Sequence, residues 1–129
     1  MGTVFEHPVS IRWRDVDGLG HVNHAVFLTY LEEGRDAFYG QMLGDLGYVM
    51  VRLEIDFRAE IRLEPRQVTV QIVPERLGTT SLTTRELVRT AAGSTAAEAR
   101  VVTVRWDQEN RRAVPFTEPE RTKLAAAIG

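Results

Sequence analysis

The chain has 129 residues, a length that fits one compact domain because domains typically run to about 100–150 residues. Hydrophobic residues make up 43% and charged residues 26%, a balance typical of folded proteins and unlike that of disordered chains. The formal net charge of −2 gives no positive field that would attract a polyanion, so nucleic acid is not an expected partner.

The sequence contains no cysteine, which excludes disulfides, thiolate metal ligands and a cysteine nucleophile. The first residues lack the basic start and apolar stretch of a secretory leader, and no apolar run reaches the roughly 18 residues of a membrane span. We therefore expect a cytoplasmic protein with no membrane partner.

Residues 4–13 show the first regular pattern, in which Val9, Ile11 and Trp13 alternate with polar neighbours. This period of two predicts a strand whose alternate side chains, Trp13 included, share one face. Residues 14–23 contain two aspartates and two glycines and break the period, so we expect a loop there.

The following segment predicts a long helix, because its apolar side chains recur at spacings of three and four residues. The apolar stripe consists of Phe27, Tyr30, Leu31, Gly34, Phe38 and Met42. Charged residues at positions 32, 33, 35 and 36 are assigned to the other side. Asn23 is the expected N-cap, and the helix should end near Leu43. Gly34 costs roughly 1 kcal/mol relative to Ala inside a helix, so its place in the stripe indicates close contact with a flat sheet.

After the helix the period returns to two, and residues 49–57 show the two-faced alternation of an antiparallel strand. Three more strands are predicted over residues 67–76, 81–90 and 95–106. Short turns around Gly78 and Gly93 favour hairpins, because parallel strands need about a dozen or more connecting residues. Residues 115–128, with Thr117 as the cap, predict a short final helix.

This element order indicates an α+β fold in which one long helix packs against a five-stranded antiparallel sheet. A single helix leaves the other face of the sheet uncovered. We expect a second copy to bury that face and the edge strand 49–57, which predicts a homodimer or homotetramer.

The chemistry-bearing residues gather immediately before the long helix. Two carboxylates, Asp15 and Asp17, and two imidazoles, His21 and His24, lie within ten residues of one another. Free amides and the dipole at a helix N-terminus stabilise negative charge, and a developing oxyanion is such a charge. A carboxylate upstream of these amides can attack a carbonyl that they polarise, or activate water against it.

At this point the sequence resembles a known family. The run Asp15-x-Asp17-x-x-Gly20-His21-Val22-Asn23-His24, followed by Phe27-Leu28-x-Tyr30-Leu31-Glu32, is similar to the signature of 4-hydroxybenzoyl-CoA thioesterase-like hotdog proteins. The resemblance is strongest over residues 9–40. It implies a single hotdog domain over residues 1–129, with a curved sheet wrapped around the helix. It also implies hydrolysis of acyl-CoA to free acid and CoA, at sites between two subunits.

The resemblance also implies roles for residues around the thioester carbonyl. It places the catalytic carboxylate at Asp17, acting as nucleophile or as general base on water. It further implies that the backbone amide at His24 polarises the thioester carbonyl. We interpret Asn23 as primarily the helix cap, and His21 as either a packed residue or one that orients the site.

On the substrate side, Gly20 belongs to the matched motif, and Tyr30 is either a core residue or part of an acyl pocket. The resemblance places CoA contacts near Arg58 and Ala59, and an arginine suits the phosphates of CoA because its planar fork binds their oxygens. Arg58 is also compatible with a solvated charge near a turn.

Other interpretations of the same residues are weaker. A metal held by the two histidines and two aspartates disagrees with the ligand spacing of a calcium loop, so we expect neither a metal nor a cofactor, and zinc at these residues is a weaker alternative. A non-catalytic acyl-CoA-binding protein of the same fold is the main alternative, and an enoyl-CoA hydratase is a further one. The identity of the acyl group does not follow from the residues.

Overall fold

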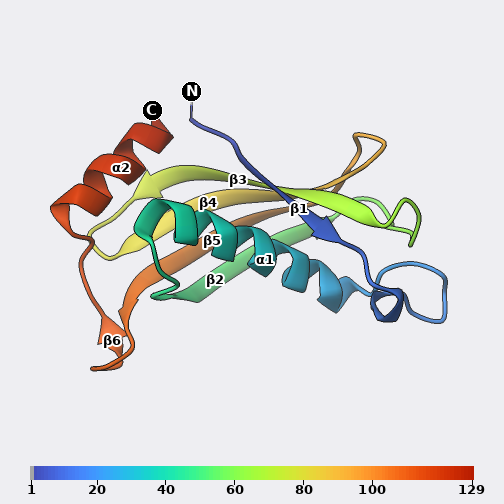
Figure 1. Ribbon diagram of the computed structural model, residues 1–129, viewed down its shortest axis with the longest axis horizontal. Helices are drawn as coiled ribbons and strands as arrows, with labels where there is room; N and C mark the ends of the chain where they lie inside the picture. Colours follow the sequence, from blue (N-terminus) through green and yellow to red (C-terminus); the bar gives the residue numbers. More distant parts are fainter. Residues whose placement is uncertain (1) are drawn as a thin grey trace.

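The computed structural model describes residues 2–129 (Figure 1). Its elements are β1 (Phe5–Ser10), a 3₁₀ turn (Trp13–Asp15), α1 (His24–Leu43), β2 (Tyr48–Phe57), β3 (Gln67–Leu77), β4 (Ser81–Thr90), β5 (Thr95–Asp107), β6 (Arg112–Ala113) and α2 (Glu118–Ile128). The long helix, the four later strands and the final helix appear where the sequence predicts them. The sequence pattern does not predict the two-residue strand β6.

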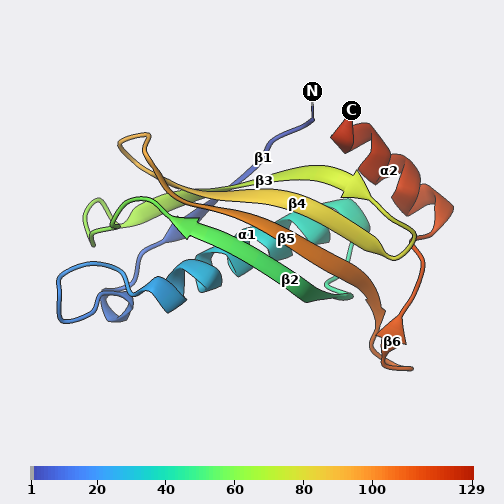
Figure 2. The same ribbon diagram turned by 180° about the vertical axis from the view of Figure 1, so that it is seen from behind.

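The main sheet is antiparallel with the order β1-β3-β4-β5-β2, and β6 pairs with the end of β5. Helix α1 crosses one face of this curved sheet (Figures 1 and 2). The predicted α+β hotdog architecture is therefore confirmed. Strand β2 forms one edge of the sheet, as expected for residues 49–57.

Gly34 allows α1 to lie against the sheet, as its place in the apolar stripe predicts. A Cβ atom at this position would lie 2.7 Å from Cβ of Val70 on β3 and closer still to its Cγ1. The helix stripe and the inward side of the strands form one continuous core. Its largest fully buried side chains are Tyr30, Tyr39, Phe27, Phe38 and Leu31.

The first strand ends earlier than its alternation predicts, and the placement of Trp13 on it is wrong. Trp13 lies in the 3₁₀ turn and is 80% exposed. The backbone amide of Arg12 donates to the carboxylate of Asp15, and this local hydrogen bond turns the chain out of the strand. Aspartate side chains compete with sheet hydrogen bonds in this way.

The sequence pattern assigns Arg35 to the polar side of the helix, and the structure corrects this. Arg35 is 4% exposed, and its guanidinium makes two hydrogen bonds with Glu86 on β4, at 3.0 and 2.7 Å. The Thr84 hydroxyl donates to the same carboxylate. The charged pair is buried because each charge has its partner, so the buried face of α1 is wider than its apolar stripe.

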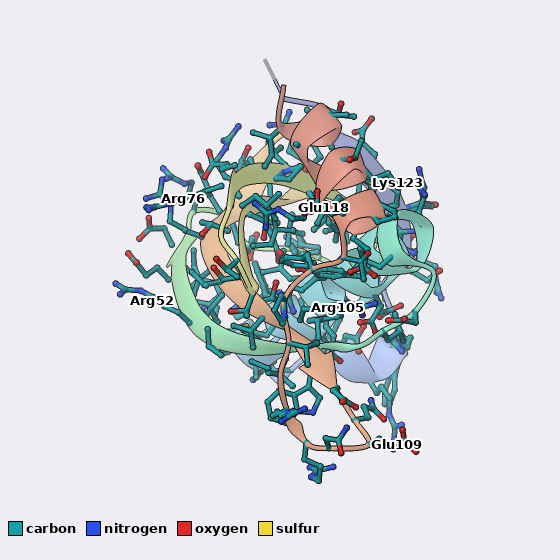
Figure 3. The ribbon with its side chains drawn as sticks, turned by 90° about the vertical axis from the view of Figure 1, so that its left-hand side faces the viewer. Arg52, Arg76, Arg105, Glu109, Glu118 and Lys123 are labelled. Carbon is teal, nitrogen blue, oxygen red and sulfur yellow. The ribbon has the colours of Figure 1, made fainter. Side chains whose placement is uncertain are left out.

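Charged side chains project from the sheet face opposite α1, which the sequence argument expects a second copy to bury. Arg52 and Arg76 project from this side (Figure 3). Ion pairs also cross it, with Arg85 3.2 Å from Glu98. Burial of this face by a second copy stays a prediction.

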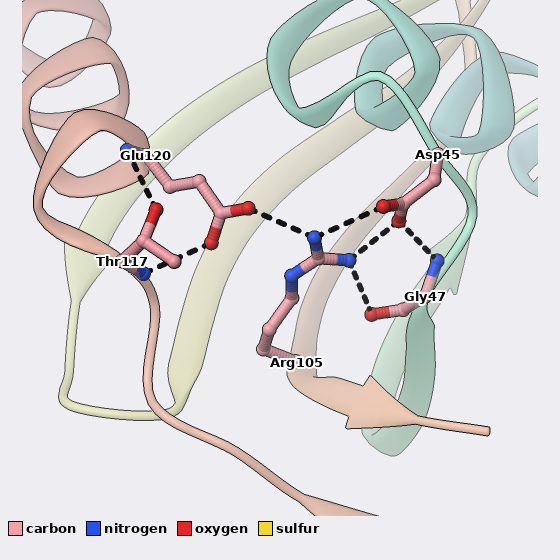
Figure 4. Close-up of polar contacts among 5 residues, drawn as sticks. All are labelled: Asp45, Gly47, Arg105, Thr117 and Glu120. Carbon is pink, nitrogen blue, oxygen red and sulfur yellow. Dashed lines mark hydrogen bonds and ion pairs between the residues drawn. The ribbon is translucent and has the colours of Figure 1, made fainter. Parts of the chain in front are cut away.

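Arg105 joins the final helix to the rest of the fold (Figure 4). Its guanidinium bonds to Asp45 after α1 and to Glu120 on α2. Hydrogen bonding to Asp45 is the main cause that raises the pKa of Arg105. Neither helix among residues 2–129 combines the length and apolar character needed to cross a membrane.

Candidate active site

The predicted catalytic loop is a short hairpin between the 3₁₀ turn and α1. An antiparallel bridge between Val16 and Val22 closes it. Within the hairpin the Asp17 amide donates to the His21 carbonyl at 2.9 Å, and the Gly20 amide donates to the Asp17 carbonyl at 3.1 Å. Gly20 has φ of +84°, a conformation that glycine adopts without strain. The motif glycine is thus required by the turn.

Asp17 is held with one carboxylate oxygen available. Its Oδ1 accepts a hydrogen bond from the Leu19 amide at 2.9 Å. Its Oδ2 lies 3.7 Å from Nδ1 of His21, beyond hydrogen-bond length. The side chain is 27% exposed. The loop therefore fixes the direction of the carboxylate and leaves Oδ2 free to meet a substrate or a water molecule.

The start of α1 presents a free amide beside this loop. Asn23 caps the helix as predicted, because its side chain accepts from the Ala25 amide at 2.9 Å. The Val26 amide donates to the Asn23 carbonyl. Within residues 2–129 the amide of His24 has no protein acceptor. His24 therefore offers a hydrogen bond at the positive end of the helix dipole.

A hollow of about 240 Å³ opens next to this amide. The histidine ring of His24 packs against Phe57 at the end of β2, with 4.7 Å between ring centroids. The hollow is lined by His21, Val22, His24, Phe27, Phe57, Ala59 and Glu60. Three predicted site residues, His21, His24 and Ala59, thus come together from two distant segments. Asp17 adjoins this group through His21.

The side chain of Arg58 does not line this hollow. Its guanidinium lies 3.3 Å from Glu98 and 3.9 Å from Asp56. It lines a separate hollow of about 420 Å³ with Arg85 on the charged sheet face. The segment after Arg58 does border the catalytic loop, because the Val22 amide donates to the Ile61 carbonyl at 2.7 Å. A role for Arg58 in CoA binding stays a prediction.

Tyr30 is fully buried beneath the loop. Its hydroxyl donates to Oδ2 of Asp15 at 2.7 Å, and burial is the main cause that raises its pKa. The structure thus shows Tyr30 as a core residue bound to the loop, which is one of its two expected roles. Sequence reasoning misses this pairing, although both residues belong to the quoted motif.

Two other observations bear on the location of the site. A larger hollow of about 490 Å³ lies around Arg105, at the other end of α1, and contains none of the predicted residues. Across residues 2–129 no group of three or more histidine, aspartate or glutamate side chains is placed to hold a metal ion. The hairpin and the helix N-terminus therefore remain the candidate site.

A curved antiparallel sheet around one long helix, with a carboxylate loop leading into that helix, defines the class of hotdog thioester hydrolases. The family model of the thioesterase-like superfamily matches residues 11–126. The chain belongs to this superfamily, which confirms the resemblance seen in its motif, and it is a thioester hydrolase.

Individual proteins are similar to this chain over most of its length. A thioesterase of Thermus thermophilus, whose crystal structure holds coenzyme A and zinc, is 35% identical; the match covers 96% of this chain and 93% of that one, with a TM-score of 0.84. A structure from Bacillus stearothermophilus described as a predicted thioesterase is 28% identical, covers 98% of both chains and has a TM-score of 0.88. The uncharacterised protein YsmA of Bacillus subtilis (strain 168) is 24% identical over 125 residues, 93% of this chain and 84% of its own length.

Proposed function

We propose that this protein hydrolyses an acyl-CoA thioester to a free acid and CoA, with Asp17 as the catalytic carboxylate. The observation that carries the proposal is the free His24 amide beside a hollow, next to a loop that leaves Oδ2 of Asp17 open. The coenzyme A in the Thermus thermophilus relative supports CoA as the thiol part of the substrate.

The His24 amide polarises the thioester carbonyl. A tetrahedral intermediate places negative charge on the carbonyl oxygen, and a helix N-terminal amide stabilises that charge without reorganising. Asn23 supports this role because its side chain occupies the Ala25 amide and fixes the first turn. Removal of one such donor typically costs about a hundredfold or more in turnover.

Hydrolysis can follow either of two routes. In the first, Oδ2 of Asp17 attacks the carbonyl carbon, the carbon–sulfur bond breaks, and water then hydrolyses the resulting mixed anhydride. In the second, Asp17 takes a proton from water, the hydroxide attacks the carbonyl, and the proton passes to the departing thiolate. His21 lines the hollow, and its Nδ1 lies 3.7 Å from Oδ2 of Asp17, so its ring borders the carboxylate in either route.

A single turnover in ¹⁸O-labelled water tests the nucleophile route. When water attacks the Asp17 carbonyl carbon of the mixed anhydride, one ¹⁸O atom stays in the Asp17 carboxylate, whereas the general-base route labels only the free acid. Mass spectrometry of the peptide that contains Asp17 reads the difference. The Asp17→Asn variant, incubated with the same substrate and labelled water, gives the unlabelled control.

We propose that assembly as a homodimer or homotetramer completes the site. Strand β2 has ten residues and forms an edge of the sheet, so only one of its sides pairs with another strand. It exposes Met50, Val51 and Phe57. Phe57 also lines the hollow. A long edge strand with exposed apolar side chains favours pairing with another strand, so a second copy at β2 would bring its residues next to the hollow.

A panel of acyl-CoA esters with detection of free thiol tests the proposed function. We expect thiol release from at least one ester. We also expect that an enoyl-CoA is not hydrated while its thioester stays intact. Addition of water to an enoyl-CoA with the thioester intact would instead favour the hydratase reading. Tight binding of every ester without thiol release would overturn the proposal.

A further inference from the structure

Asp15 ties together the two ends of the catalytic hairpin. Its carbonyl accepts a hydrogen bond from the amide of Asn23, the cap of α1, at 3.0 Å. Its carboxylate accepts from the Arg12 amide at 2.9 Å, on the chain that leads into the hairpin. The residue is only 7% exposed, so these contacts are shielded from water. One residue therefore fixes both the entry and the exit of the segment that carries Asp17.

Tyr30 connects this junction to the helix. Its hydroxyl donates to the same oxygen of Asp15, Oδ2, that accepts from the Arg12 amide. Tyr30 is completely buried in α1, so the position of its hydroxyl is set by the packed core. Because burial raises the pKa of Tyr30, the hydroxyl keeps its proton over the range in which thioesters are assayed.

We infer that Tyr30 and Asp15 are positioning residues that hold the Asp17 carboxylate at a fixed distance from the His24 amide. The inference rests on the proposed role of Asp17. Neither side chain lines the hollow beside His24, so neither is assigned a contact with the substrate. Their effect on turnover passes through the hairpin, because a small displacement of a catalytic group costs orders of magnitude in rate.

Tyr39 provides a matched control on the same helix. It is also a buried tyrosine, and its hydroxyl bonds to Thr103 on β5, away from the hairpin. Tyr30→Phe and Tyr39→Phe therefore each remove one buried hydroxyl from α1. A loss of general stability would affect the two variants alike, whereas a loss of loop position would affect only the first.

For Tyr30→Phe we expect kcat on an acyl-CoA ester to fall about tenfold with KM within about twofold of wild type. For Tyr39→Phe we expect both constants within about twofold. Amide hydrogen exchange at Leu19 and Gly20 should be faster in the first variant and unchanged in the second. Wild-type kcat in folded Tyr30→Phe, or equal losses of kcat in both variants, would overturn the inference.

Asp15 supplies a second test that does not depend on the tyrosine variant folding. Both hydrogen bonds end on one oxygen, so Asp15→Asn can retain them through its amide oxygen, whereas Asp15→Ala loses both. We expect Asp15→Asn to keep kcat within about threefold and Asp15→Ala to lose about tenfold or more. A large loss in Asp15→Asn would make the charge itself essential and refute a purely positional role. Because hydrogen exchange reports the hairpin directly, it tests the inference even if Asp17 proves dispensable.

Discussion

Oδ2 of Asp17 lies 3.7 Å from Nδ1 of His21, and His21 in turn lines the hollow beside the His24 amide. The pair is too far apart for a hydrogen bond, so His21 does not occupy the carboxylate oxygen. Its ring faces that of His24, with 6.3 Å between centroids. The arrangement connects the carboxylate of the hairpin to the polarising end of α1, which is why the proposed chemistry centres on Asp17.

Arg58 tests how CoA is bound. If its guanidinium leaves Glu98 to bind the CoA phosphates, Arg58→Ala should raise KM for acyl-CoA about tenfold and weaken inhibition by free CoA. Hydrolysis of a short thioester that lacks the nucleotide should stay nearly unchanged. Arg100→Ala is the control, since Arg100 lines the same hollow on the sheet face opposite α1 as Arg58 does. Equal losses on both substrates would show that Arg58 supports the fold or the chemistry.

The edge strand β2 tests the proposed assembly. Val51→Lys places a charge on an exposed position of this edge, and charged edge residues oppose strand pairing. Light scattering at micromolar concentration should show at least a dimer for the wild type and a smaller species for the variant, with reduced thiol release. Val4→Lys, at an exposed position before β1, should leave both properties unchanged. A wild-type monomer with full activity would contradict a site completed by a second copy.

Two glycines of α1 test how the helix packs. Gly34→Ala forces a methyl group into Val70 and should lower the free energy of unfolding by about 1–3 kcal/mol. A Cβ at Gly40 meets no atom within 4 Å, so Gly40→Ala should raise the free energy of unfolding by about 0.5–1 kcal/mol through helix propensity. Urea unfolding measures both values. Stabilisation by Gly34→Ala would show that the helix does not need its close contact with β3.

Features set by neighbouring residues could be predicted from the sequence. The Asn23 cap, the helix it starts and the need for a small side chain at Gly34 all follow from local spacing and backbone chemistry. The motif also assigns roles to Asp17 and the His24 amide, and those roles stay predictions. Each of these depends on contacts within a few residues or on one repeated pattern.

Features that depend on distant partners could not be predicted in the same way. Arg35 is buried only because Glu86, 51 residues further along the chain, neutralises it. Trp13 leaves the strand because Asp15 captures the Arg12 amide, a competition that apolar periodicity does not register. Phe57 reaches the wall of the hollow because β2 ends beside the start of α1. Its contact with His24 therefore follows from the topology.

The most direct test of the central claim is the turnover of Asp17→Asn on an acyl-CoA ester, measured by release of free thiol. The substitution keeps the size of the side chain and an acceptor for the Leu19 amide, but it removes the nucleophile or base. With Glu109→Gln as a charge-matched control on the exposed turn after β5, we expect the Asp17 variant to lose at least about a hundredfold in kcat with an unchanged Tm, and the control to match wild type. Wild-type turnover by folded Asp17→Asn would contradict the account and remove Asp17 from the mechanism.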